Sequence, residues 1–325
     1  MKLPRTSTRA LTVLIAGEDP AVAKCREILE GEAKELALQV RTVEFNDVAA
    51  AMSGLQQPSL GELSITLLLP ALDTWSRMPH FNSCGTPYLR SAEYPWGLPW
   101  LSPESSQFTR LQKANQKVLN TINLARTALQ QNPKMVLLLL HPEDLGQCGV
   151  SRPASIWQLP EVHNLAREFC LSRHAAYQCE WGESEFRALV AILSTVSLGK
   201  GFAKGWLVFQ GTANSQYRGP LPPDCKCAQT HPKTSEMSRA TRKSTSFMAK
   251  PFLSQLARLA LKKVLKLRLA DGGKSGLAQS EEEDSSGTEG QCWSELEEYG
   301  QQGVRPYKWE HPSEELQEAS NQAGT

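Results

Sequence analysis

A chain of 325 residues can hold one large domain or two small ones, and its 40% of hydrophobic residues suffices for a packed core. No apolar run approaches the ~20 residues that span a bilayer, so we expect a soluble protein without a transmembrane segment. The net charge of +1 hides an asymmetry, because residues 271–325 hold 13 acidic and 3 basic residues and residues 1–270 therefore carry +11. A basic body favours a polyanionic partner, and the alternative is an ordinary solvated surface with a solubilising tail.

The eight cysteines are scattered along the chain rather than gathered in a small loop-rich frame. This distribution predicts reduced thiols in an intracellular protein, with the nucleus as a candidate compartment. The basic N-terminus and the apolar run after it faintly resemble a secretory signal, but Glu18-Asp19-Pro20 makes a poor cleavage region. We therefore interpret the apolar run as a first strand.

Short apolar runs alternate with helical patterns over the first half of the chain. We expect strands at 10–16, 40–45, 65–69 and 135–140, and helices at 21–38 and 107–131. Near-continuous apolar strands are typical of a parallel sheet that is buried on both faces. We predict a Rossmann-like α/β domain over residues 1–200, with a mostly parallel sheet whose strand-end loops open on one edge.

The first two predicted strands carry the pattern of a nucleotide site. Gly17 follows the first strand, and Glu44 lies at the end of the second. In a Rossmann-type site the turn after strand one lets the backbone approach the ligand, and the acid after strand two accepts hydrogen bonds from ribose hydroxyls. Taken alone the pattern is weak, because only one glycine of a glycine-rich turn is present.

Two later strands run directly into polar loops. Residues 64–77 pass from an apolar strand into Asp73, Thr74 and Ser76, and a long loop rich in proline and aromatic residues follows at 78–103. Residues 135–144 repeat the passage and end in His141-Pro142-Glu143-Asp144. Long loops inside compact domains are usually functional, so both passages are candidates for a shared site.

The second half of the chain is expected to contain a helix at 162–172, a strand at 175–179 and a helix at 185–196. A basic extension at 201–270 includes an amphipathic helix at 251–270, whose apolar side holds Leu253, Leu256, Ala260, Val264 and Leu267.

Within that extension, residues 204–268 contain 13 Lys/Arg and 2 acidic residues, which favours contacts with the phosphates of DNA or RNA. The helix could instead pack its apolar face on the sheet or lie on an anionic membrane surface. Residues 271–325 have few apolar residues and are predicted to form an acidic disordered tail.

Cysteine and histidine suggest two further sites. Cys225, Cys227 and His231 supply three ligand types that zinc prefers, but they lack the usual partner pair, so an ordinary loop is the alternative. His141 and His174 are candidate general bases, although lone histidines are more often structural and no Ser/His/Asp ordering stands out.

Several segments carry a resemblance to a known family. LIAGED, VEFND, PALDTWSR and LHPEDLG resemble, in order and spacing, the first half of S-adenosylmethionine-dependent cytosine-5 methyltransferases. TPYLRSAEYPWGLPWLSP, HPEDLG, PASIWQLPE, YQCEWG and YRGPLPPDCKC look like the divergent methyltransferase-like reading frames that are abundant in dinoflagellate genomes near mobile elements. The resemblance covers residues 10–265 and implies a Rossmann-like methyltransferase fold.

The resemblance also places the family's functional positions on this chain. The Pro-Cys pair whose cysteine attacks the base corresponds to Ala71-Leu72, and the carboxylate that holds the base corresponds to Leu140. Both losses remove the covalent chemistry. Gly17 and Glu44 correspond to the cofactor turn and the ribose-binding acid, which makes S-adenosylmethionine the candidate cofactor, although Asp19 replaces the second glycine of the turn.

Two classes of function follow. The first is a methyltransferase-fold protein that is related to nucleic-acid cytosine methylation and is catalytically degenerate, that is, a pseudoenzyme. The second is a non-enzymatic scaffold that binds nucleic acid or protein and derives from a mobile element.

Overall fold

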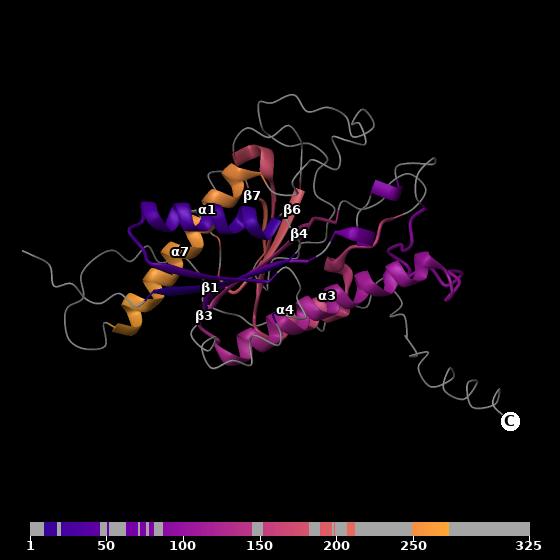
Figure 1. The fold of residues 1–325 in the computed structure, drawn as a ribbon, viewed down its shortest axis with the longest axis horizontal. Coiled ribbons are helices and arrows are strands. Elements are labelled where there is room, and N and C mark those ends of the chain that lie inside the picture. The colour runs from indigo at the N-terminus through magenta and orange to yellow at the C-terminus, as the bar shows by residue number, and fades with distance from the viewer. Residues whose placement is uncertain are drawn as a thin grey trace, which may run out of the picture. The chain divides into compact units, whose positions relative to one another are not determined.

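The structure, a computed structural model, describes residues 10–17, 21–45, 51, 63–70, 72–75, 78–80, 87–144, 152–181, 189–196, 198, 207–211 and 249–272. A seven-stranded sheet lies between two pairs of helices (Figure 1). Its strands are β1 (Leu11–Gly17), β2 (Val40–Phe45), β3 (Leu63–Leu69), β4 (Val136–Pro142), β5 (Ser172–Tyr177), β6 (Leu189–Ser194) and β7 (Leu207–Gly211). The four strands predicted in the first half are all confirmed, with ends shifted by two residues at most.

The strand order is β2-β1-β3-β4-β6-β5-β7. The strands β2, β1, β3 and β4 pair in parallel, whereas β6 is antiparallel to both of its neighbours and β7 is antiparallel to β5. β1 to β5 therefore run in one direction, which confirms the predicted mostly parallel α/β sheet. The carboxyl ends of these five strands lie at one edge of the sheet, which we call the carboxyl edge.

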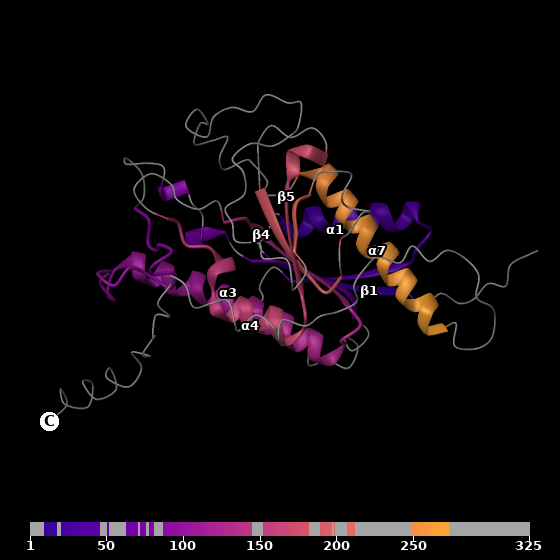
Figure 2. The same ribbon diagram turned by 180° about the vertical axis from the view of Figure 1, so that it is seen from behind.

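Helices cover both faces of the sheet. α1 (Ala21–Glu35) and α7 (Lys250–Gly272) lie on one face, and α3 (Ser106–Gln131) and α4 (Pro160–Glu168) lie on the other (Figures 1 and 2). Short 3-10 helices follow several strands: η2 (Asp73–Trp75), η3 (Met78–His80), η4 (Ile156–Gln158) and η5 (Gln178–Trp181). The described part of the loop at 87–103 contains neither a helix nor a strand, as predicted.

The core has two halves because successive strand residues point to opposite faces. In β1, Leu14 and Ala16 pack toward α3 and α4, while Val13 and Ile15 pack toward α1 and α7. All residues of β3 are buried. Burial on both faces explains why the central strands are near-continuous apolar runs rather than alternating ones.

The prediction of a helix at 185–196 is wrong, because β6 occupies residues 189–194. The run Leu189 to Leu193 is short and apolar, and its pattern fits a buried helix as well as a strand buried on both faces. The sheet decides between them, because β6 is inserted between β4 and β5 and pairs with both. The predicted helix at 162–172 is also shorter, since α4 ends at Glu168 and Ser172 already belongs to β5.

α7 packs its apolar side against the sheet and α1, which confirms the interpretation of the amphipathic helix as a packed element. Leu253, Leu256 and Val264 are buried, but Leu267 is 39% exposed, so the buried stripe ends one turn earlier than predicted. Glu32 of α1 fastens the contact: it accepts hydrogen bonds from the Ser254 hydroxyl and from Arg258 Nε, the latter at 2.6 Å.

The described helices include none that is long and apolar enough to cross a membrane. The predicted acidic tail lies outside the described residues except for Asp271 and Gly272, which end α7. Most of the basic extension before α7 also lies outside them.

Candidate functional site

The carboxyl edge has a topological switch point between β1 and β3. The chain leaves β1 through α1 to β2 on one side, and β3 lies on the other side of β1. Open α/β sheets bind ligands outside the carboxyl ends of their strands at such a point. The ends of β1, β2, β3 and β4 therefore make up the candidate site.

Gly17 ends β1 at the switch point, and close packing of two strands requires a glycine there. It lies opposite Leu69 of β3, and an added Cβ would be 2.7 Å from Leu69 Cβ and 2.8 Å from its carbonyl oxygen. Neither atom can yield without moving a strand. Gly17 thus serves the fold, and a substitution at this position would change stability before it reported on a ligand.

Glu44 lies one residue before the end of β2, on the strand next to β1. Its side chain is 27% exposed and accepts a hydrogen bond from Arg26 Nη1 at 2.8 Å. Exposed ion pairs contribute roughly 0–1 kcal/mol, so the carboxylate can exchange Arg26 for the hydroxyls of a ligand at little cost. Among the described residues, Glu44 places a partly exposed carboxylate beside the switch point.

The chain after β3 turns at once into η2. The backbone carbonyl of Leu72 accepts a hydrogen bond from Trp75 N at 2.7 Å, and Asp73 pairs with Arg110 of α3 at 2.6 Å. Trp75 is 3% exposed and meets Trp96 edge to face, with ring centroids 5.9 Å apart. η2 is thereby held against α3 and the loop at 87–103.

Arg90 of that loop is 1% exposed, and its guanidinium carbon lies 3.8 Å from the centroid of the Trp75 ring. Nη1 donates to the Pro95 carbonyl at 2.7 Å, and Nη2 donates to the Thr74 hydroxyl. Burial lowers the pKa of Arg90 to about 9, and Asp73 acts in the opposite direction. The side chain remains a cation at neutral pH.

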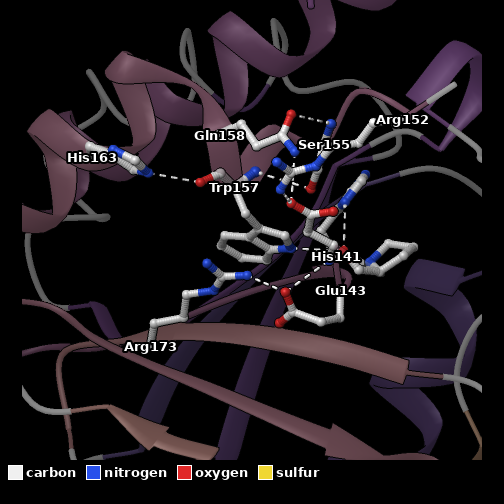
Figure 3. A network of polar contacts seen from close by, with 10 residues as sticks. His141, Glu143, Arg152, Ser155, Trp157, Gln158, His163 and Arg173 are labelled. Carbon is white, nitrogen blue, oxygen red and sulfur yellow. Dashed lines mark hydrogen bonds and ion pairs between the residues drawn. The ribbon is translucent and has the colours of Figure 1, made fainter. Parts of the chain in front are cut away.

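A second buried network follows β4 (Figure 3). The side chain of Glu143 is 0% exposed and pairs with Arg173 of β5, which reaches along the sheet from two strands away. The Arg173 guanidinium carbon lies 4.9 Å from the ring centroid of Trp157, and Trp157 Nε1 donates to the Pro142 carbonyl at 2.7 Å. The three side chains fix the end of β4 against η4.

Asp144 extends this network toward the surface. Its carboxylate accepts hydrogen bonds from Arg152 at 2.6 Å and from Gln158 Nε2 at 2.7 Å. Gln158 and Ser155 form a capping box that starts η4. Both carboxylates after β4 are therefore engaged, that of Glu143 with Arg173 and that of Asp144 with the loop at 152–159.

His141 and His174 are buried in the sheet and are held neutral. Burial lowers the pKa of His141 to about 3, and the nearby charge of Arg90 acts in the same direction. Burial lowers the pKa of His174 to about 4, and the backbone of Val196 acts in the opposite direction. His174 lies in the interior of β5, 0% exposed, so a role as a general base for a bound substrate is not supported.

The positions that the resemblance gives to catalysis hold no reactive group. Leu140 lies inside β4, fully buried and paired with Ile192 of β6, so its side chain belongs to the core rather than to the carboxyl edge. Leu72 contributes its backbone to η2. The thiol of Cys25 is buried in α1, and burial raises its pKa to about 12, which makes it a poor nucleophile.

Within the described residues no group of three histidine, cysteine or acidic side chains is arranged to hold a metal ion. Cys225, Cys227 and His231 lie outside that part of the chain, as does Cys84, a cysteine of the loop at 78–103.

Sequence reasoning missed Arg90, Trp157 and Arg173 and did not assign a role to Glu143. The sequence marked two of these residues only by their position: Glu143 follows a predicted strand, and Arg90 lies in the proline-rich loop. Nothing in a linear pattern marks a charged residue as buried.

Searches against protein families, curated proteins and solved structures found no match to this chain.

Proposed function

We propose that this chain is a methyltransferase-fold protein that binds S-adenosylmethionine, or a related adenosine ligand, at the switch point and is catalytically degenerate. The observation that carries the proposal is the strand order β2-β1-β3 with the Glu44 carboxylate next to the switch point. Ligands of Rossmann-like sheets bind at this place, with an acid after the second strand on the ribose hydroxyls.

The residues at the switch point are compatible with such a ligand. Glu44 would accept hydrogen bonds from the ribose, and the backbone at Gly17 would lie beside the rest of the ligand. When bound, S-adenosylmethionine supplies an activated methyl group. Leu72 and Leu140 offer neither a thiolate nor a carboxylate to a cytosine, so the proposal includes no methyl transfer through a covalent base adduct.

We expect the 325-residue chain to bind S-adenosylmethionine saturably in isothermal titration calorimetry, and Glu44→Ala to weaken the affinity about tenfold. A hydrogen bond to a charged group contributes roughly 1.5–3 kcal/mol, and 1.4 kcal/mol is a factor of ten. Glu168→Ala is the matched control, because Glu168 is also a surface glutamate paired with an arginine, at 2.9 Å from Arg126. The proposal would be contradicted if the wild type did not bind the ligand, or if Glu44→Ala bound it with the same affinity as the wild type.

We also expect no methyl transfer to cytosine. Nucleophilic and general acid–base terms together account for many orders of magnitude in rate, and the two corresponding positions hold Leu72 and Leu140. Labelled S-adenosylmethionine and cytosine-containing DNA should give no transfer above background, and DNA with 5-fluorocytosine should trap no adduct. A stable adduct that mapped to Cys84 or Cys179 would contradict the assignment of Leu72 and restore the enzyme interpretation.

The second candidate is a nucleic-acid-binding scaffold, and the exposed face of α7 favours it. Lys262, Lys263 and Lys266 are exposed, whereas Arg258 one turn earlier pairs with Glu32 and Glu35. A filter-binding titration of duplex DNA at several salt concentrations distinguishes this candidate, since each lost phosphate contact lowers the salt dependence by about one unit of slope. Lys262→Gln/Lys266→Gln should reduce that slope, while Arg258→Gln should not.

A further inference from the structure

Arg90 has no counter-ion among the residues that the structure describes. It is 1% exposed, and the acid that acts on it electrostatically, Asp73, is already paired with Arg110 at 2.6 Å. Burying a charge without a partner costs several kcal/mol, and folded proteins rarely keep such a group without a use for it. Arg90 therefore needs an explanation beyond packing.

The guanidinium of Arg90 is fixed in place before any ligand arrives. The Pro95 carbonyl and the Thr74 hydroxyl each take one of its N–H groups, and the Trp75 ring lies under it at 3.8 Å. The loop that carries it is tied down as well, because Leu98 N donates to the Leu89 carbonyl at 3.0 Å. A donor group held this firmly loses little entropy when it binds a ligand.

Two buried N–H donors in this cluster have no acceptor. Arg90 Nε and Trp75 Nε1 are both buried and without a hydrogen-bond partner. They belong to two stacked groups at the carboxyl end of β3. An unsatisfied buried donor is destabilising, so two of them beside a cation without a counter-ion form a place where an acceptor with negative charge would be stabilised.

We propose that Arg90 and Trp75 form an anion-binding site at the carboxyl end of β3 that takes a phosphate group, from a free nucleotide or from a nucleic-acid strand. Phosphate suits the site because it offers several acceptor oxygens and a negative charge to a planar, fixed guanidinium. The site goes beyond the proposed function, because S-adenosylmethionine carries no phosphate. Its ligand is a second molecule bound beside the switch point.

The Nε–H resonances of the arginines test the site directly in the wild-type chain, and a variant is needed only to assign one of them. The full chain labelled with ¹⁵N is titrated with inorganic phosphate, AMP, a short single-stranded oligodeoxynucleotide, and acetate at constant ionic strength. One Nε–H resonance, assigned by its absence in Arg90→Lys, should shift and saturate with phosphate or AMP or the oligonucleotide. The tightest of these identifies the source of the phosphate.

Thermal unfolding separates binding from a merely structural role. The phosphate-dependent rise in Tm should be lost in Arg90→Lys and retained in Arg110→Lys, the control at the neighbouring arginine of α3. A structural role would lower the Tm of Arg90→Lys by the same amount with and without phosphate. That result would overturn the proposal. So would an Arg90 Nε–H resonance that does not shift, or a response to acetate as large as the response to phosphate. Glu44→Ala should keep the phosphate response, so failure at the switch point and failure here are distinguishable.

Discussion

The free energy of unfolding should fall by about 5 kcal/mol between about pH 7.5 and about pH 4.5 through two histidines alone. Burial holds the pKa of His141 at about 3 and that of His174 at about 4. In the unfolded chain both histidines have a pKa of about 6.5. As the pH falls below this value, the unfolded state therefore binds two protons that the native state does not bind. Stability from these groups is complete above about pH 6.5 and is lost as the pH falls toward the folded values.

Urea unfolding at a series of pH values measures this loss, followed by far-ultraviolet circular dichroism. The variant His141→Gln/His174→Gln keeps polar side chains that do not titrate. Its unfolding should therefore take up as many as two fewer protons, and its free energy of unfolding should depend less steeply on pH. His163, whose pKa burial also lowers, stays in place in both proteins and does not enter the difference. Equal slopes for the two proteins would show that the histidines are not buried in the neutral form.

The strands of the first half could be predicted from the sequence because burial on both faces leaves a direct mark. β3 and β4 contain near-continuous apolar runs, which are typical of a strand in the middle of a covered sheet. The helices α3 and α7 could be predicted for a related reason, since each has one apolar stripe and one polar face. The strand β6 could not be predicted, because its short apolar run is compatible with a buried helix as well as with a buried strand.

The buried charges could not be predicted for a different reason. Glu143 and Arg173 are 30 residues apart in the chain, and they meet only because β6 is inserted between β4 and β5 and sets the distance between them. Arg90 and Trp75 meet because a long loop folds back on η2. In each case the strand order or the path of a loop determines which residues meet. A short stretch of sequence indicates neither the strand order nor the loop path.

Replacing Arg173 with methionine should lower the free energy of unfolding by about 3 kcal/mol, because it removes the ion pair of the buried Glu143 carboxylate. Glu143 is 0% exposed, and Arg173 is 20% exposed, so solvent cannot take over the lost interaction. The methionine retains much of the contact with Trp157. The measurement is the shift in the urea midpoint with an unchanged m-value.

Two controls show whether the loss comes from the stranded charge. Arg173→Met/Glu143→Gln removes both charges and should recover most of the lost stability, since replacing both members of a buried pair is often neutral. Arg126→Met breaks the exposed pair with Glu168 and should cost less than about 1 kcal/mol. If Arg173→Met cost no more than Arg126→Met, the Glu143 network would not be what holds the end of β4 against η4, and the carboxylate would be available at the carboxyl edge for a ligand.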